Sequence, residues 1–322
     1  MIRDKRHLLY GLSTDSYSLK GIWLLGLLYC GSLFVAVFLS LAAWNITHTV
    51  DPDGSSYLAS KPYTKFFDRS RWFCVLLILP FLFWKCRITS FQAAGFNRPF
   101  SKTTAIWFAY GIGMIAIIYG SSAIFGAIQL KPGASASGFI SNLGNALLAG
   151  ILVGLLEEIV FRGLVFRMFY TALKPIPAIL ISSAFFAILH FKADAEVFTD
   201  ISPQEIGIFE GFYTAWAMMS ALVTEFDFTY LASIFLVGVV LHQVFLLTSN
   251  LWANAALHAG WVFTIKAVGG GFQTSPYANA FTGTTRVADG YLVILVLIVF
   301  CAIFAWKLRS KTATLEERKV TK

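Results

Sequence analysis

Long apolar runs separated by short polar segments dominate this chain. A bilayer core of about 30 Å needs roughly 20 apolar residues in a helix, and fewer where flanking Arg or Lys side chains reach the interface. By that measure, the eight predicted spans are 21–43, 68–84, 104–128, 143–168, 176–191, 229–248, 251–268 and 290–307. The pattern predicts an all-α fold, a polytopic bundle of about eight transmembrane helices.

A ninth apolar stretch, 206–223, differs from these eight because it lies in an acidic neighbourhood. The surrounding segment 192–228 has one base, Lys192. Its seven acids are Asp194, Glu196, Asp200, Glu205, Glu210, Glu225 and Asp227. Cytoplasmic loops carry an excess of Lys and Arg, so we expect 192–228 to be an external or re-entrant excursion.

Basic residues decide the predicted orientation. With eight spans, the basic segments all fall on one side of the membrane, which places both termini in the cytoplasm. The residues concerned are Arg3, Lys5, Arg6, Lys85, Arg87, Arg98, Lys102, Arg167, Lys174, Lys307, Arg309 and Lys311. We expect one membrane domain with an N-terminal transmembrane region (1–139), a core (140–268) and a C-terminal region (269–322) that holds a loop, the last span and a basic tail.

Composition agrees with a multi-pass integral membrane protein. Hydrophobic residues make up 57% and charged residues 13%, whereas charged residues are about 25% of soluble proteins. The net charge of +8 would suit nucleic acid in a soluble protein, but in a membrane protein it indicates contact with anionic lipid. No basic motif with interleaved aromatic residues is present, so we expect the lipid bilayer as a partner and no nucleic acid.

Seven ionisable residues stand out within the predicted spans. A charged side chain at bilayer depth costs about 2.5 to 3.5 kcal/mol on insertion scales, which makes each one a candidate functional residue. They are Glu157, Glu158, Arg162, His190, His242, His258 and Lys266. Lys266 is near the end of its span, where we expect its amine to reach the interface.

The fourth and fifth spans are predicted to form an antiparallel hairpin, because Pro175 and Pro177 interrupt the helix after Lys174. Glu157 precedes Lys174 by 17 residues, and His190 follows it by 16. At about 1.5 Å per residue, regular helices would bring both residues to one depth, roughly 25 Å from the turn. The sixth and seventh spans turn near Ser249, and His242 and His258 are each 8 residues from Asn250.

Glu158 and Arg162 have the i,i+4 spacing at which an acid N-terminal to a base pairs best. Arg162 would then hold Glu158 and leave Glu157, about 100° around the helix, for chemistry. Gly150 and Gly154 form a GxxxG surface that lets a neighbouring helix approach closely. The alternative is a buried ion pair that fixes helix packing without chemistry.

Three motifs in order resemble one family. E157-E158-x-x-x-R162, F186-x-x-x-H190 and the later H258 behind a short hairpin resemble the CPBP family (CAAX protease and bacteriocin-processing, or Abi) of intramembrane endopeptidases. That family includes the eukaryotic type II CAAX prenyl endopeptidases. The resemblance covers roughly residues 140 to 268, and it implies a catalytic cavity between the fourth and seventh spans.

The resemblance implies that Glu157 activates a water for attack on a peptide carbonyl. His190 and His258 would line the same cavity and would polarise the carbonyl, stabilise the oxyanion or bind a metal. We favour a metal-independent glutamic peptidase without a cofactor. Because two His and one Glu also suit a catalytic zinc ion, the alternative is a zinc site at Glu157, His190 and His258.

One position departs from the family pattern, which usually ends in His-x-x-x-Asn, because Val262 follows His258 by four residues. Asn254, one turn before His258, is our candidate for the missing amide. We interpret His242, which no motif includes, as a structural residue, although its predicted depth also suits a substitute donor. The expected substrate is a membrane protein or lipidated peptide with a prenylated or other C-terminal tag. The alternatives are an inactive family member that acts in immunity or scaffolding, and a proton-coupled transporter.

Overall fold

The computed structural model describes residues 20–85, 88, 90–97, 100–191, 198 and 201–320. For residues 20–22, 171–172 and 312–320 it describes the backbone alone. Some of the charges used above lie outside the described residues. These are Arg3, Lys5, Arg6, Arg87, Arg98, Lys192, Asp194, Glu196 and Asp200.

Backbone contacts divide the chain into two compact units. Among the described residues, unit 1 comprises 88–187 and 227–320, and unit 2 comprises 20–85 and 188–226. Each unit is therefore assembled from segments that are far apart in sequence. This division differs from the single domain with borders at 139 and 268 that the motifs suggested, because motif borders do not follow packing.

Unit 2 is a small helical unit whose core lies between two long helices and a shorter one. Its elements are α2 (Lys20–Val50), α3 (Tyr63–Lys85), the 3₁₀ helix η2 (Pro203–Glu205) and α9 (Ile208–Thr224). A Cβ at Gly211 of α9 would lie only 2.7 Å from Val37 Cγ1 of α2, so the two helices approach closely there. Leu33, Ala36 and Phe67 are buried at this core.

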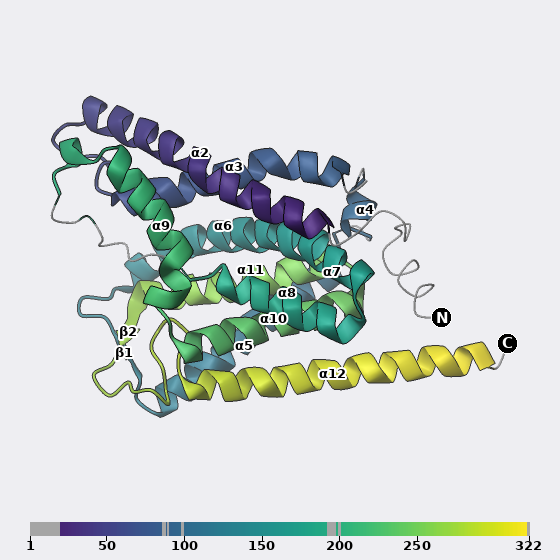
Figure 1. Cartoon of the computed structure of the whole chain (residues 1–322). Helices are drawn as coiled ribbons and strands as arrows, with labels where there is room; N and C mark the ends of the chain where they lie inside the picture. The colour runs from purple at the N-terminus through teal and green to yellow at the C-terminus, as the bar shows by residue number, and fades with distance from the viewer. Residues whose placement is uncertain are drawn as a thin grey trace. The chain divides into compact units, whose positions relative to one another are not determined.

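Most of the helices in the described part of the chain belong to unit 1 (Figure 1). They are α4 (Phe91–Ala94), α5 (Lys102–Ile124), α6 (Ala136–Val160), the π-helix η1 (Phe161–Val165), α7 (Phe166–Ala172), α8 (Pro175–Ile188), α10 (Phe228–Thr248), α11 (Leu251–Gly271) and α12 (Tyr291–Val320). Two short strands, β1 (Ile128–Leu130) and β2 (Phe272–Thr274), pair antiparallel with Gln129 opposite Gln273. The pairing ties the α5–α6 connection to the C-terminal end of α11.

Helix α11 lies between α5 and α6, and glycines make both contacts close. A Cβ at Gly154 would come within 2.7 Å of Ala259 N, and one at Gly150 within 2.6 Å of Ala259 O. On the other side, a Cβ at Gly260 would lie 3.1 Å from the Cα of Gly111 in α5. The close helix approach predicted from Gly150 and Gly154 is confirmed, and the partner helix is α11.

The two predicted hairpin turns are also present. Helix α7 ends at Ala172 and α8 begins at Pro175, where a missing N–H costs no helical hydrogen bond. Helix α10 ends at Thr248, Ser249 adopts a left-handed conformation (φ 52°), and the Asn250 side chain caps α11 by accepting from Trp252 N.

Among the described residues, five helices are long and apolar enough to cross a membrane, which fits an integral membrane protein. Their ranges are Trp23–Val50, Lys102–Ile124, Ala136–Tyr170, Phe228–Thr248 and Tyr291–Lys311. The other three predicted spans are helical too, but α8 has only 14 residues, α3 carries several charges, and α11 is rich in small and polar residues. The count of eight spans stays a prediction. Helix α9 has 17 residues and is not among the five.

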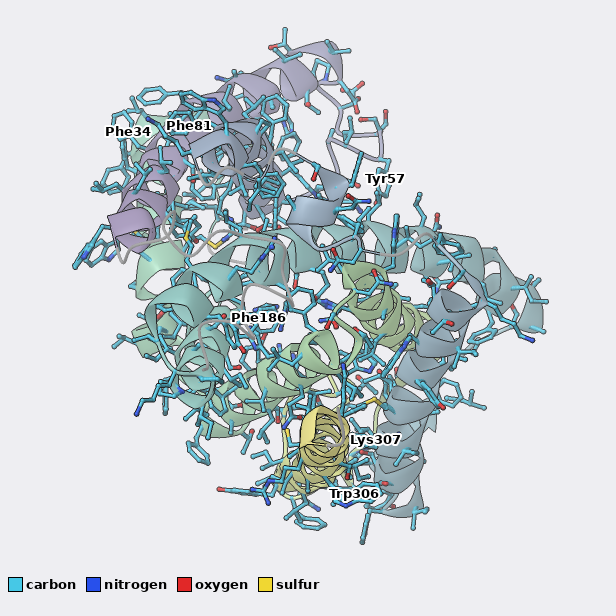
Figure 2. The ribbon with its side chains drawn as sticks, turned by 90° about the vertical axis from the view of Figure 1, so that its right-hand side faces the viewer. Phe34, Tyr57, Phe81, Phe186, Trp306 and Lys307 are labelled. Carbon is cyan, nitrogen blue, oxygen red and sulfur yellow. The ribbon has the colours of Figure 1, made fainter. Side chains whose placement is uncertain are left out.

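Aromatic side chains are exposed in both units. Phe34 and Phe81 in unit 2 and Trp306 in unit 1 are exposed, and Figure 2 shows them pointing away from the helices that bear them. Phe186, by contrast, is enclosed within unit 1. Exposed aromatic and aliphatic side chains of this kind suit contact with lipid.

Candidate active site

A π-helical turn follows immediately after the two adjacent acids. Helices α6 and α7 continue one another through η1, where the Phe166 N–H donates to Phe161 O, five residues back. All five residues of η1, Arg162 among them, are buried. Single π turns inside α-helices occur often at functional sites. The sequence predicts one regular helix over 143–168, and nothing in its pattern marks this turn.

Glu158 is the centre of a fully buried polar cluster. Its Oε1 accepts hydrogen bonds from Arg162 Nη1 at 2.8 Å and from His258 Nδ1 at 2.9 Å. Its Oε2 accepts from Asn254 Nδ2 at 2.9 Å. A buried carboxylate is tolerated when it is both paired and hydrogen-bonded. These contacts show the Glu158–Arg162 pair that the i,i+4 spacing predicts.

Arg162 links this cluster to two further helices. Its Nη2 donates to Gly238 O of α10 at 3.3 Å, and its guanidinium lies 4.8 Å from the ring centre of Phe186 in α8. The rings of Phe161 and Phe186 meet edge to face, 4.8 Å apart. The phenylalanine of the F186-x-x-x-H190 motif therefore packs on the arginine of the E157-E158-x-x-x-R162 motif, a cation–π contact that sequence reasoning did not foresee.

His258 lies between the two acids. Its Nδ1 is hydrogen-bonded to Glu158, while its Nε2 is 3.8 Å from Glu157 Oε2. The Glu157 side chain is 13% exposed, whereas that of Glu158 is completely buried. The adjacent acids are thus not equivalent, because Glu158 anchors one side of the imidazole and Glu157 faces the other.

The side-chain amide of Asn254 donates two hydrogen bonds. One N–H of its side-chain amide donates to Glu158 Oε2 and the other to Leu241 O at 2.8 Å. An amide has only two N–H donors. Both donors of Asn254 are therefore engaged, and its side chain helps to hold Glu158 in place. Its predicted role as the missing oxyanion donor stays a prediction.

His190 lies in a turn, two residues beyond the end of α8, and is half-buried. The depth arithmetic assumed a regular helix to residue 191, whereas α8 ends at Ile188. Residue 190 falls in unit 2 and Glu157 in unit 1. The meeting of His190 with Glu157 and His258 stays a prediction.

His242 is a buried core residue. Its Nε2 contacts Ser182 Oγ at 3.0 Å, its Nδ1 contacts Ser183 Oγ at 3.1 Å, and its ring packs 4.3 Å from that of Phe166. With both ring nitrogens held by hydroxyl groups of α8, His242 joins α8 to α10. These contacts agree with the structural interpretation drawn from the sequence.

Lys266 and Arg167 were both predicted to lie at an edge of the membrane. Lys266 is exposed, as expected of an interfacial lysine. Arg167 is fully buried and donates to Ala93 O at the end of α4 and to Gly163 O at 3.4 Å, and its place at the cytoplasmic edge stays a prediction. Backbone carbonyls from a neighbouring helix take the place of water around this guanidinium.

A catalytic metal ion needs several His, Cys, Asp or Glu side chains close together. Among the described residues, no group of three or more His, Cys, Asp or Glu side chains could hold a metal ion. Glu157 Oε2 and His258 Nε2 are 3.8 Å apart, and the third predicted ligand, His190, belongs to the other unit. The zinc site at Glu157, His190 and His258 stays an alternative prediction.

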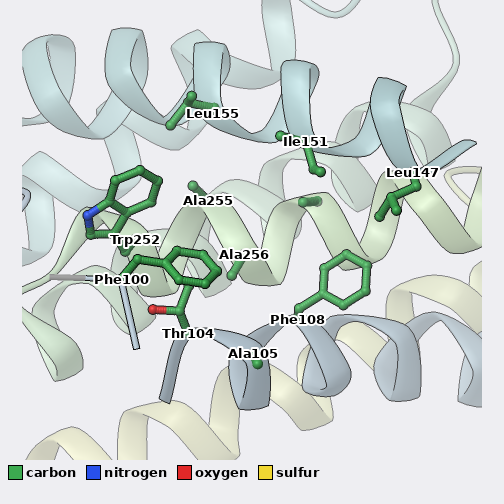
Figure 3. A pocket seen from close by; sticks show the side chains of 11 residues that line it. Phe100, Thr104, Ala105, Phe108, Leu147, Ile151, Leu155, Trp252, Ala255 and Ala256 are labelled. Carbon is green, nitrogen blue, oxygen red and sulfur yellow. The ribbon is translucent and has the colours of Figure 1, made fainter. Parts of the chain in front are cut away.

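An apolar groove of about 280 Å³ lies beside this cluster in unit 1 (Figure 3). Leu147, Ile151 and Leu155 of α6 form one wall, and Figure 3 shows Phe100 and Trp252 at one end. On α11, groove residues Ala255 and Ala259 come directly after Asn254 and His258 in sequence. Helices α6 and α11 thus carry the polar cluster on one face and line the apolar groove with another.

A family model matches the part of the chain that contains this cluster. Residues 139–264 match the family model described as type II CAAX prenyl endopeptidase, Rce1-like. We call residues 139–264, which are similar to that family, the CPBP region. This match confirms the resemblance that the three motifs indicated. The CPBP region extends from the start of α6 into α11 and includes every predicted site residue.

Searches of curated proteins and of solved structures found no match. The CPBP assignment therefore rests on the family model and on the motifs. Val262, the departure from the usual motif, lies inside the matched region.

Proposed function

We propose that this protein is an intramembrane endopeptidase that uses a water activated by Glu157 to cleave a membrane-associated peptide. The observation that carries the proposal is the position of His258, hydrogen-bonded to Glu158 through Nδ1 and 3.8 Å from Glu157 through Nε2. We propose that the attacking water binds to both the imidazole and the Glu157 carboxylate. The CPBP match supports a protease.

The proposed reaction is hydrolysis by general acid–base catalysis. The Glu157 carboxylate takes a proton from water as the hydroxide oxygen bonds to the peptide carbonyl carbon. The carbonyl oxygen becomes an oxyanion, which the protonated Nε2 of His258 stabilises. When the C–N bond breaks, Glu157 returns the proton to the leaving nitrogen. The products are a carboxylic acid and an amine.

Glu158, Arg162 and Asn254 act as positioning residues in this scheme. Their hydrogen bonds fix the imidazole of His258 by directing its Nδ1–H at Glu158. A carboxylate that accepts from Nδ1–H fixes the orientation of the imidazole and favours its doubly protonated form, whose Nε2–H can then donate to the oxyanion. We propose His190 as a second group that polarises the carbonyl, as the motif match implies.

For the substrate, we propose a membrane protein or lipidated peptide with a prenylated or other C-terminal tag. The CAAX prenyl endopeptidase family match supports this class, and an apolar groove beside the acids suits a hydrophobic segment. We further propose that both termini are cytoplasmic and that no zinc or other cofactor is needed.

The deciding experiment compares wild type with Glu157→Gln and Glu157→Ala on a quenched, farnesylated CAAX peptide in proteoliposomes. Both variants should lose at least about 1,000-fold in kcat, because a carboxamide cannot accept the proton. Glu225→Gln, the same change at an exposed residue at the end of α9, serves as the matched control and should cleave normally. Full activity of Glu157→Gln would overturn the proposal.

Val262 favours one second candidate, an inactive CPBP-type protein that acts in immunity or scaffolding. It predicts that wild type and Glu157→Gln are equally unable to cleave any membrane substrate, while both rescue the phenotype of a deletion strain. A proton flux that depends on Glu157 in the same proteoliposomes would instead favour a transporter.

A further inference from the structure

An oxyanion formed next to His258 needs further N–H donors, and the two obvious sources are absent or engaged. Val262 has no polar group, and both N–H groups of Asn254 are engaged by Glu158 and Leu241. We propose that the indole Nε1–H of Trp261 donates to the oxyanion. The inference rests on the proposed function and adds a catalytic residue to it.

Trp261 is next to His258 on the surface of α11. Residues three apart on a helix are surface neighbours, and the rings of His258 and Trp261 have their centres 6.0 Å apart. Trp261 is buried in a hydrophobic cluster of unit 1, with 4% of the residue exposed. It is therefore held in place by packing, as a preorganised donor must be.

The Nε1–H of Trp261 is buried and makes no hydrogen bond within the described part of the chain. An indole nitrogen is a donor only, and it usually finds an acceptor when buried. A donor kept from water without a protein acceptor is poised for an acceptor on a ligand. The oxygen of a peptide carbonyl is such an acceptor, and it accepts more strongly once it carries negative charge.

Arg162 offers no equal alternative as a donor in unit 1. Its Nη1 and Nη2 already donate to Glu158 and to Gly238 O, and its guanidinium lies over Phe186. The Arg162 Nε–H, like the Trp261 Nε1–H, has no partner among the described residues, but the guanidinium is fixed by Glu158, Gly238 and Phe186. The ring of Trp261 differs because it lies beside the imidazole that faces Glu157.

The first test is Trp261→Phe, which removes the N–H and keeps an aromatic ring. We expect kcat on the farnesylated CAAX peptide to fall roughly 100-fold with KM changed less than about threefold, since the donor acts on charge that develops in the transition state. Trp107→Phe is the matched control, because Trp107 packs against the same apolar cluster as Trp261 and should tolerate the change.

The second test adds Val262→Asn to Trp261→Phe. An amide four residues after His258 would return an N–H donor, so we expect kcat to recover about tenfold, whereas a packing defect would not be rescued in this way. Val262→Asn in the wild-type background should change kcat far less.

A third readout does not depend on turnover. The indole ¹H–¹⁵N resonance of Trp261, identified by its loss in Trp261→Phe, should shift when a farnesylated peptide aldehyde binds as its tetrahedral hydrate. An unchanged resonance with the aldehyde bound would overturn the inference.

The outcomes separate the two proposals. Glu157→Gln inactive with Trp261→Phe within threefold of wild type would contradict the donor role and leave the peptidase proposal standing. Glu157→Gln fully active with Trp261→Phe strongly impaired would instead overturn the glutamate base and support the donor role.

Discussion

Among the described residues, a fully buried arginine–carboxylate pair lies in unit 1 and a largely buried one in unit 2, and they differ in what surrounds them. In unit 1, Glu158 and Arg162 are both completely buried at the α6–η1 junction. In unit 2, Asp68 and Arg71 of α3 are 2.6 Å apart, with side chains 19% and 8% exposed. Both pairs form within one helix, at i,i+4 and i,i+3.

Their additional partners distinguish them. Arg71 also donates to the phenol of Tyr29 in α2 at 3.1 Å, which joins two helices. Glu158 instead receives an imidazole and an amide from α11, and the imidazole faces a second acid, Glu157. A buried ion pair alone thus indicates helix packing, and the acid–imidazole–acid sequence is what makes the first pair a candidate catalytic site.

Removing each arginine should produce the largest contrast. Arg162→Met leaves the Glu158 charge buried without its main partner, which should cost about 3 to 5 kcal/mol of stability and abolish cleavage. Arg71→Met should cost about 1 kcal/mol, because Asp68 still reaches water. Thermal unfolding in detergent and the peptide assay measure both effects, and equal losses in the two variants would contradict the comparison.

Removing the amide should have an intermediate effect. Asn254→Ala deletes the donor to Glu158 Oε2 and to Leu241 O, which should cost about 1 to 3 kcal/mol of stability. We expect kcat to fall about tenfold, less than in Trp261→Phe, because Asn254 holds a residue that holds His258 and does not touch the oxyanion. A loss of kcat larger than that of Trp261→Phe would support Asn254 as an oxyanion donor.

Removing the phenol oxygen in unit 2 should have the smallest effect. Tyr29→Phe deletes one hydrogen bond to Arg71 and should lower stability by about 1 kcal/mol. The kcat for the farnesylated peptide should remain that of wild type, since the Asp68–Arg71 pair is proposed to serve packing only. A selective loss of cleavage with unchanged thermal stability would show that this pair belongs to the catalytic machinery.

Local patterns predicted much of the site. The helix period alone places Glu158 beside Arg162, and Pro175 and Asn250 mark the two turns that the structure contains. Gly150 and Gly154 correctly indicated a close helix contact. The π turn over Phe161–Val165 escaped prediction, since its residues differ in no obvious way from those of an ordinary apolar helix.

Long-range contacts give two residues partners that the sequence did not predict. Arg167 resembles an edge charge until the carbonyl of Ala93, 74 residues away, is placed against it. Asn254 resembles a free donor until Leu241 O and Glu158 Oε2 take its two N–H groups. A pattern along one helix gives no information about the acceptors on its neighbours.

The sequence by itself determined that this chain is helical and apolar, that it carries three CPBP motifs, and that Glu158 pairs with Arg162. Helix geometry and hydropathy are properties of neighbouring residues, so they can be read along the chain. The tertiary structure alone decided that His258 bonds to Glu158 and faces Glu157, and that Trp261 keeps a buried donor beside it. Those contacts depend on how α6, α10 and α11 are rotated and packed against one another. The close glycine contacts of α11, together with the rest of the core, determine that packing.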